Sequence, residues 1–501
     1  DQAAVETKVS ELLDQLVDAA TDGEQSYSAD VEPWFEGEVA FSMGPIPTSM
    51  ASDPEAAAAA SRALLLVSVK DAALAQTWFD AAFEKADITG TDETYQGTTL
   101  TIFSDPAMGE VQIAFGIVDG KVAVVGDLTS VKAAVDSGGS GGLADTEDFG
   151  AAISANDSDH VGFTYIAMRP VMDAMIELNE SMGMDQTTMS DELMALIPDW
   201  VSFRLRVEGD ALVMDTANPH VDTAPGPDDN AANEVAAFAP PSTIALGAAN
   251  DYGATLDELA ALYANEPSMA DAMSQLEEVL GVVGGLDAAI SWMGDSGVVV
   301  STAGDTVEGG IISVPTDAAD AAQFLTSLKS LVGLGGGQVG VEVREEEYAG
   351  ATITIIDLGT AEDLVGMIGM FGGMPVDPGS VAGLPEGEIE LSYATTDDVV
   401  VIGSGPGFVK AVLDAGAGES LADSARYRDL VAKAGSEHTA VTYLDITAIR
   451  TLAEGFLADA TAEQRAEYEE SIKPFLEPFD ALVATTVVGG IDEQHIRITV
   501  K

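Results

Sequence analysis

The sequence predicts an α+β protein with two tandem duplicated lobes, each a mainly antiparallel sheet with helices packed on one face. Three observations lead to this class. A long stretch of the first half recurs in the second half. Runs rich in Val, Ile and Thr follow one another with short turn signals between them, as antiparallel strands do. Segments with helical spacing of apolar residues alternate with these runs.

The recurring stretch covers residues 119–149 and 397–427. Each copy reads as a β-branched strand, a tight turn, a short helix, a Gly-rich link and the tripeptide Leu-Ala-Asp before a second helix. Lys132 and Lys410 hold equivalent positions in the two short helices. His160 and His438, which open two similar strands, have the same separation in the sequence. A register that holds over this distance indicates an internal duplication.

The register also predicts the domain organisation. A first lobe covers residues 1–217, an acidic linker rich in Pro, Asp and Asn covers 218–238, and a second lobe covers 239–501. The offset between matching segments is 253 residues at Tyr95 and Tyr348 but 278 at the two lysines. The second lobe therefore carries an insertion at about residues 361–387.

The elements of the first lobe follow in order along the chain. An amphipathic helix begins it, with apolar residues at helical spacing from Val5 to Val17. An aromatic-anchored strand, a second strand, a helix and a meander of strands come next. The lobe closes with a Met-rich helical region and a hairpin that turns at Gly209. The expected segments after the first helix are 31–44, 63–69, 72–86, 95–103, 111–120, 121–127, 160–168, 169–197 and 201–217.

The two lobes differ at their start. The second lobe opens with a strand at residues 240–251 and then a helix, whereas the first lobe opens with only the helix. We expect a longer precursor, in which this strand and an export signal or membrane anchor precede Asp1. The alternative is a first lobe with an open strand site near Asp1, which a neighbouring molecule fills by strand addition.

The charge of the chain constrains its environment and partners. It has 85 Asp and Glu against 20 Lys and Arg, a net charge of −65, yet 47% of its residues are apolar, which favours a folded protein. Such charge opposes compaction unless salt screens it, and at about 1 M the Debye length is only about 3 Å. We expect a saline or cation-rich setting, with an ordinary acidic secreted protein as the alternative. Nucleic acid and anionic lipid are disfavoured as partners, whereas cations and basic partners are not.

Catalytic motifs are weak in this sequence. There is no cysteine, which excludes thiolate metal sites and thiol nucleophiles. The Gly-rich stretch 403–407 lacks the third glycine of a dinucleotide fingerprint, and the first copy has Asp127 at this place. Ser140 lies in a flexible link and not after a strand, so it is no nucleophile elbow. The spacing of the four histidines gives no ligand set, and an acidic cluster at residues 222–230 lacks calcium-loop spacing. We therefore expect no catalytic, cofactor or metal site.

The insertion carries the most apolar Gly-rich patch in the chain. It is either a buried helix cap or an exposed contact surface, and its presence in one lobe only favours a contact surface. The residues of this candidate contact surface are Leu364, Val365, Met367, Ile368, Met370, Phe371 and Met374.

Several spaced signatures resemble domain-of-unknown-function family 3352. They are Pro-Trp-Phe-Glu-Gly at residues 33–37, LLVSVKD at 65–71, Tyr-x-Gly at 95–97, VVGDLTSVKAAVD at 124–136 and LADTEDF at 143–149. The resemblance covers nearly the whole chain, once per lobe, and implies an exported or membrane-anchored protein of the bacterial envelope with no assigned chemistry. The family's opening Pro-x-x-Thr strand is absent from the first lobe, whereas Pro241, Ser242 and Thr243 keep it in the second.

Together these features predict a non-enzymatic extracytoplasmic protein, either secreted or at the cell surface, that acts as a structural or binding component of a bacterial envelope. A self-assembling filament or layer subunit is the alternative. An enzyme of unknown type is the least supported interpretation.

Overall fold

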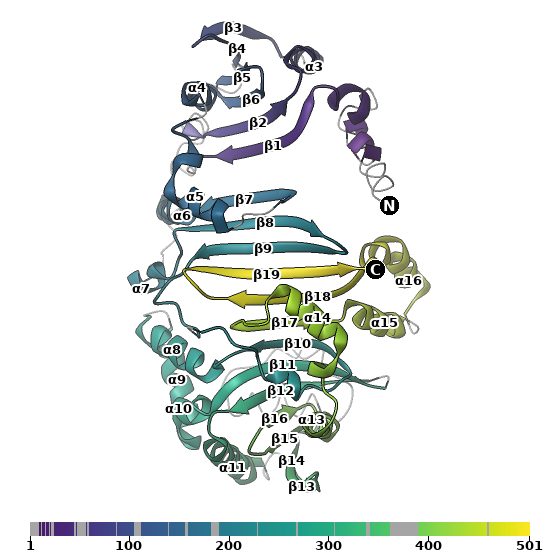
Figure 1. Ribbon diagram of the computed structural model, residues 1–501. Helices are drawn as coiled ribbons and strands as arrows, with labels where there is room; N and C mark the ends of the chain where they lie inside the picture. The colour runs from purple at the N-terminus through teal and green to yellow at the C-terminus, as the bar shows by residue number, and fades with distance from the viewer. Residues whose placement is uncertain are drawn as a thin grey trace. The chain divides into compact units, whose positions relative to one another are not determined.

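A computed structural model describes the chain except for residues 1–9, 12, 16, 20, 22–24, 45–46, 48–56, 58–59, 87, 105–111, 139, 156–158, 182–189, 228, 267–268, 305, 337–340, 361–388 and 458–459. Antiparallel sheets and helices make up the described part, which confirms the α+β class (Figure 1). The chain divides into two compact units. Unit 1 comprises residues 1–151 and 167–188, and unit 2 comprises 152–166 and 189–501.

Unit 1 contains a six-stranded antiparallel sheet with the order β1-β2-β6-β5-β4-β3. Its strands are β1 (Phe35–Met43), β2 (Ala63–Val69), β3 (Gly90–Tyr95), β4 (Thr98–Ser104), β5 (Gln112–Val118) and β6 (Val122–Asp127). The helices of this part of the chain are η1 (Tyr27–Val31), α3 (Ala72–Lys85), α4 (Leu128–Ser137), η4 (Leu143–Asp145), α5 (Glu147–Ala155) and α6 (Met168–Ser181).

Two helices cover opposite faces of this sheet. Phe79 of α3 packs in one core with Trp34, Phe103 and Phe115, whereas α4 packs in a second core with Leu100 and Val124. Each helix begins at an aspartate whose side chain accepts hydrogen bonds from the first-turn amides, Asp71 for α3 and Asp127 for α4. The sequence predicted helices on one face only. They cover both, because alternate residues of the central strands are apolar on each face.

Unit 2 contains a 13-stranded antiparallel sheet with the order β13-β14-β15-β16-β12-β11-β10-β17-β18-β19-β9-β8-β7. Its strands are β7 (Gly162–Ala167), β8 (Trp200–Glu208), β9 (Ala211–Pro219), β10 (Thr243–Ala249), β11 (Met293–Ala303), β12 (Thr306–Pro315), β13 (Glu342–Tyr348), β14 (Ala351–Asp357), β15 (Glu390–Thr395), β16 (Val400–Gly403), β17 (Ala440–Leu444), β18 (Phe479–Val487) and β19 (Ile491–Val500).

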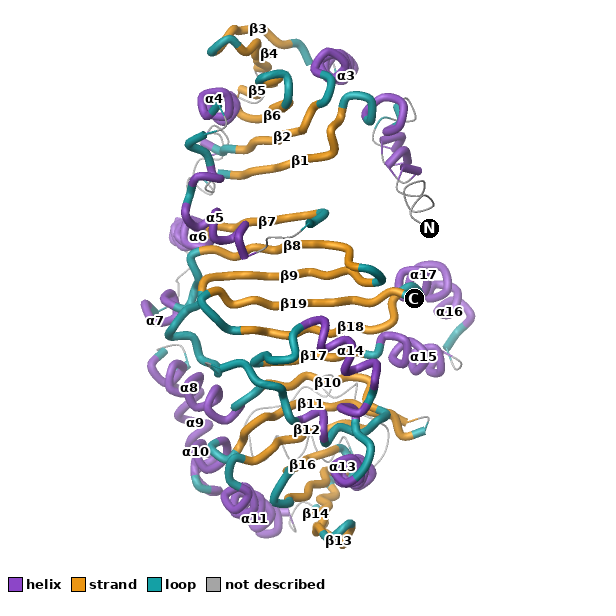
Figure 2. Tube along the Cα trace, viewed as in Figure 1, coloured by secondary structure: helices purple, strands orange, loops and turns teal. Residues whose placement is uncertain are grey.

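The helices of unit 2 lie along the sheet and at the ends of its strands (Figure 2). They are α7 (Asp191–Ala195), η5 (Val235–Ala237), α8 (Tyr252–Asn265), α9 (Ala270–Leu280), η6 (Gly281–Val283), α10 (Gly285–Ile290), α11 (Ala318–Gly336), α13 (Pro406–Ala417), η8 (Leu421–Asp423), α14 (Ala425–Ala434), α15 (Ile446–Phe456), α16 (Ala462–Glu467), η10 (Tyr468–Ile472) and α17 (Lys473–Leu476).

The largest core of unit 2 lies under α13 and α14. Phe408 and Val412 of α13 and Leu430 of α14 pack there against Val299, Ile353 and other strand residues. On the opposite face of the same strands, α11 packs in a separate core. As in unit 1, strands β14 to β16 are therefore covered by helices on both faces.

The strand order of unit 1 recurs inside unit 2. Strands β11-β12-β16-β15-β14-β13 are neighbours in the same sequence as β1-β2-β6-β5-β4-β3. The hairpin β3–β4 turns at Gln96 and Gly97, and β13–β14 turns at Ala349 and Gly350, all four with positive φ, as a tight two-residue hairpin turn requires. The units nevertheless divide the chain differently from the sequence lobes, because β7, β8 and β9 belong to the sheet of unit 2.

Candidate functional site

A buried ionic cluster joins three neighbouring strands of unit 2. Asp215 of β9 is almost fully buried, and its carboxylate accepts hydrogen bonds from both flanking strands. On β8, Arg204 donates to it from Nε at 3.1 Å and from Nη2 at 2.5 Å, and Arg206 donates from Nε at 2.9 Å. On β19, the Nδ1 of His495 lies 2.8 Å from the other carboxylate oxygen. Asp215 is thus a partner shared by three cationic groups.

The protonation states of this cluster are mutually dependent. Burial alone would raise the pKa of Asp215, but the hydrogen bonds from His495, Arg206 and Arg204 outweigh it and hold that pKa well below its usual range. The hydrogen bonds to Asp215 and Glu493 raise the pKa of His495 to about 9, against the opposing effect of burial. His495 is therefore a cation at neutral pH. A general base would have to be neutral there, so the arrangement is that of a structural ion network.

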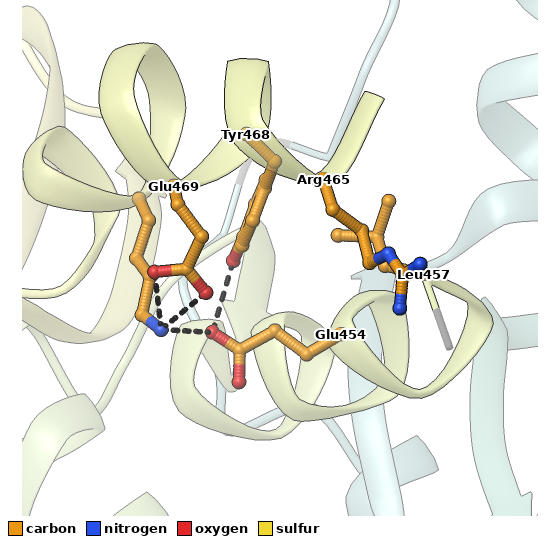
Figure 3. A pocket seen from close by; sticks show the side chains of 6 residues that line it. Glu454, Leu457, Arg465, Tyr468 and Glu469 are labelled. Carbon is orange, nitrogen blue, oxygen red and sulfur yellow. Dashed lines mark hydrogen bonds and ion pairs between the residues drawn. The ribbon is translucent and has the colours of Figure 1, made fainter. Parts of the chain in front are cut away.

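A surface hollow of about 260 Å³ lies between α15, α16 and η10 (Figure 3). Its charged groups face one another. The hydroxyl of Tyr468 donates to Glu454 at 3.1 Å, and Nζ of Lys473 donates to Glu469 at 2.9 Å. Burial and the hydrogen bond to Glu454 raise the pKa of Tyr468. These interactions hold the helices together, and the two carboxylates already have cationic or hydroxyl partners. Leu457 and Arg465 complete the lining.

Lys132 and Lys410 belong to matching surface clusters. Lys132 forms an ion pair with Glu93 at 3.0 Å and lies 5.0 Å from the centre of the Tyr95 ring. The hydroxyl of Tyr95 donates to Asp136 at 2.8 Å. Each of these contacts ties α4 to the hairpin β3–β4.

The second cluster repeats this arrangement between α13 and the hairpin β13–β14. Lys410 pairs with Glu346 at 2.8 Å and lies 5.5 Å from the ring centre of Tyr348, whose hydroxyl donates to Asp414 at 2.8 Å. Both clusters are exposed and internally paired, so their role is to hold a helix on a hairpin.

The Gly-rich stretch before α13 has no room for a phosphate. A Cβ at Gly407 would lie 2.5 Å from a carboxylate oxygen of Glu308, so that acid occupies the helix start. At the equivalent place in unit 1, the carboxylate of Asp127 accepts a hydrogen bond from the backbone amide of Ser130 at 3.0 Å. An acidic group at each helix start supports the interpretation of these turns as structural.

The repeat-matched histidines lie in different surroundings. His438 is buried, and its Nδ1 lies 2.9 Å from the carbonyl oxygen of Gly435, whereas His160 is exposed with its ring near Phe163. Ser140 donates to the carbonyl of Ser137 just after α4. In the described part of the chain, no group of three or more acidic or histidine side chains could hold a metal ion.

One face of the sheet in unit 2 is apolar and exposed. The strand pairing places alternate residues of β8, β9, β19 and β18 side by side on this face. It continues through β17 and β10 to β11 and β12. The exposed large side chains on this apolar sheet face are Phe203, Leu205, Val207, Met214, Val298, Val307 and Ile311. Arg204, Asp215 and His495 point to the opposite face, and between Phe203 and Ile311 the central rows of the apolar face carry no charged residue.

Sequence reasoning did not find the ionic cluster or the apolar sheet face. Alternation along β8 between apolar and basic residues, from Phe203 to Arg206, was the available signal. The predicted contact surface, Leu364 to Met374, lies outside the described residues.

These features define an α+β protein of antiparallel sheets whose charged clusters hold its elements together. The chain belongs to the family described as "Protein of unknown function (DUF3352)", which matches residues 1–331. This confirms the resemblance predicted from the sequence. No curated protein and no solved structure matches the chain. Among the described helices, none has the length and apolarity needed to span a bilayer.

Proposed function

We propose that this protein is a non-enzymatic, extracytoplasmic structural or binding component of a bacterial cell envelope in a saline or cation-rich setting. The observation that supports it most is the distribution of charge. A chain with a net charge of −65 keeps charged residues off the central rows of a broad, exposed sheet face. Apolar patches of this kind are typical of contact surfaces.

The charged clusters support a structural role. Asp215, Glu454 and Asp414 each have partners within the chain at hydrogen-bond distance. Groups paired in this way stabilise packing and are not free to bind or activate a substrate. A saline setting fits this role. Salt screens the repulsion between the acidic residues, which favours the folded chain and allows its apolar sheet face to approach another envelope component.

The location is tested by fractionation of cells that produce the protein from its own gene. We expect it in the envelope or the medium. The double variant Leu205→Asp/Met214→Asp should leave the envelope fraction, because two charges on the apolar sheet face oppose its contact with a partner. Phe475→Asp is the matched control, since Phe475 is an exposed apolar residue of α17 outside this face. Protein in the cytoplasmic fraction would contradict the proposal.

A second candidate function is that of a self-assembling surface subunit. It is favoured by the ends of the two sheets, where β1 in unit 1 and β7 in unit 2 each have a strand neighbour on one side only within the described residues. Sedimentation velocity in about 0.05 and about 2 M NaCl tests it. A ladder of oligomers at high salt supports assembly, whereas a monomer at both concentrations contradicts it.

A further inference from the structure

Strand β1 of unit 1 exposes three large apolar side chains on the face that α3 covers. Val39 is opposite Val67 of β2, and Val67 packs in the same core as Phe79 of α3. Side chains that lie opposite each other in antiparallel strands point to one face, and Phe41 and Met43 share it because strand side chains alternate. Val39, Phe41 and Met43 are 61%, 63% and 67% exposed. We call these three residues the unit 1 patch.

Unit 2 exposes a similar group on the face that α11 covers. Ile402 of β16 packs against the core that contains Leu325 of α11, and Ile311 of β12 lies opposite Ile402. Val298 of β11 lies opposite Ile311, and Val307 points to the same face of β12 by alternation. The exposed fractions of Val298, Val307 and Ile311 are 56%, 41% and 42%. We call these three residues the unit 2 patch.

The two patches hold the same place in the two copies of the strand order. Strands β1 and β2 correspond to β11 and β12, and α3 follows β2 as α11 follows β12. Each patch therefore lies on the first strands beyond the equivalent helix, on the face that this helix covers. Isolated exposed apolar residues are common, but a group that recurs at the same place in both copies indicates a contact surface.

The charges around the patches indicate the chemistry of what binds there. No Lys or Arg lies between Lys8 and Arg62, the stretch that contains β1, or between Arg206 and Lys329, the stretch that contains β11 and β12. Both glutamates of β1 are exposed, as are the two acidic residues of α8, a helix that contacts β11. In a chain with a net charge of −65, such surroundings attract a cationic partner and repel an acidic one.

The helices beside the patches indicate the shape of the partner. Helices α3 and α11 lie on the same sheet faces and bury apolar side chains against them. Neighbouring helices pack about 8–10 Å apart, which is about the width of two strands. Strands β12 and β11 are the next two beyond β16, which α11 covers, so they give room for one further helix. In unit 1 the equivalent place is beside α3, over β1.

We propose that each patch binds an amphipathic helix of a cationic partner protein. The apolar side of the helix covers the patch, and its Lys and Arg side chains lie toward the acidic residues around it. The proposal rests on the proposed role as a binding component and names the chemistry of the partner. It does not depend on where the protein is located.

Synthetic peptides test the chemistry by isothermal titration calorimetry with the chain of residues 1–501. The cationic peptide has the sequence of residues 72–85, which form α3, with all of its polar positions changed to Lys: Gln76→Lys, Thr77→Lys, Asp80→Lys and Glu84→Lys. An acidic peptide has Glu at the same positions. A third peptide keeps the Lys residues but loses the aromatic side chains through Trp78→Ser, Phe79→Ser and Phe83→Ser.

We expect the cationic peptide to saturate at about two per chain and to bind at least about tenfold more tightly than either control peptide. Equal affinity for the peptide without aromatic side chains would overturn the proposal, because net charge alone would then explain the binding. Equal affinity for the acidic peptide would overturn the assignment to a cationic partner.

Variants of the chain locate the two sites. Phe41→Ser/Met43→Ser should remove one binding site and Val298→Ser/Ile311→Ser the other, since serine removes the apolar contact without adding charge. Phe475→Ser is the matched control, because Phe475 is exposed on α17 outside both patches, and it should leave both sites intact. Circular dichroism confirms that the variants fold. Peptide binding that both double variants leave unchanged would overturn the proposal.

Sedimentation velocity of the chain without peptide tests a different occupant. A dimer that Phe41→Ser/Met43→Ser dissociates would show that a second copy covers the unit 1 patch, and it would overturn the proposal of a cationic partner. The proposed location fails separately, through the fractionation of cells. Loss of peptide binding leaves an envelope location intact, and a cytoplasmic location leaves the measured peptide affinity intact.

Discussion

The six strands of unit 1 and strands β11 to β16 of unit 2 have the same order but different surroundings. The core under α3 is aromatic, with Trp34, Phe79 and Phe115, whereas α11 packs mainly on aliphatic residues such as Ile356 and Val400. The outer edge of β1 has no strand neighbour among the described residues, whereas that of β11 is paired with β10. The same order of strands can thus be filled by different side chains, and its first strand can lie at the edge of a sheet or inside one.

A cavity in the core of unit 1 should produce the largest difference in stability between the two units. Phe115→Ala removes an almost fully buried ring that packs against Phe79 and Phe83. We expect the free energy of unfolding of unit 1 to fall by about 4 kcal/mol, since lost burial and the cavity add together. Differential scanning calorimetry should show an earlier transition for unit 1 and an unchanged one for unit 2. Equal shifts of both transitions would show that the units unfold as one.

The pairing of β9 with β8 and β19 is tested through Asp215. Asp215→Ala leaves the buried Arg204 without its carboxylate partner on β9 and should destabilise unit 2 by about 3 kcal/mol. Denaturation in urea measures the loss. Asp492→Ala removes a carboxylate that pairs with His220 near the surface and is the control, with an expected change below about 1 kcal/mol. Similar losses for the two variants would show that the buried cluster at Asp215 stabilises unit 2 no more than an ion pair near the surface does.

The same cluster predicts a dependence of stability on pH. The folded pKa of His495, about 9, lies above its unfolded value of 6.5. Protonated His495 therefore stabilises the fold fully below about pH 6.5, and this contribution, about 3 kcal/mol, is lost as the pH rises through 9. Asp215 acts in the opposite direction, because its depressed pKa gives stability that is lost as the pH falls well below 3.8.

Urea denaturation of the unchanged chain and of His495→Gln between about pH 6 and about pH 10 checks this dependence. We expect the difference between the two proteins to shrink as the pH rises. A constant difference across this range would show that His495 does not titrate in the folded state as its hydrogen bonds to Asp215 and Glu493 require.

The different burial of side chains on β11 and β1 gives a smaller expected effect. Val299→Ala should cost about 1.5 kcal/mol, since Val299 is fully buried, whereas Phe41→Ala should cost less than about 0.5 kcal/mol. Urea denaturation of both variants tests this difference. A large loss for Phe41→Ala would mean that Phe41 is covered in solution.

The matching surface clusters provide the smallest expected effects. Tyr95→Phe and Tyr348→Phe each remove one exposed hydrogen bond, to Asp136 and Asp414 respectively, and each should cost about 0.5 kcal/mol. Calorimetry should assign the first loss to unit 1 and the second to unit 2. Losses that differ by more than about 1 kcal/mol would show that the two clusters are not equivalent.

Much of the local structure could be predicted from the sequence. Gly209 indicated the hairpin turn between β8 and β9, and the β-branched runs around Val124 and Val401 indicated buried strands, because these signals depend on neighbouring residues along the chain. The hairpin turns at Gly97 and Gly350 were not predicted, since Gly97 was placed inside an expected strand. The sequence did not predict the contacts of Asp215. Residues far apart in the chain meet there, and neither hydrophobic alternation nor composition states which strands become neighbours.

By itself, the sequence determined the α+β class, the order of most helices and strands, the repeated Leu-Ala-Asp turns and the acidic character of the chain. These follow from local propensity, from side-chain periodicity and from counting charges. Only the tertiary structure decided that β9 pairs with β19, that Asp215 is shared by three cationic groups and that Phe41 is exposed while Val299 is buried. Strand pairing between distant segments sets these features, because burial and pKa depend on which groups surround a residue in space.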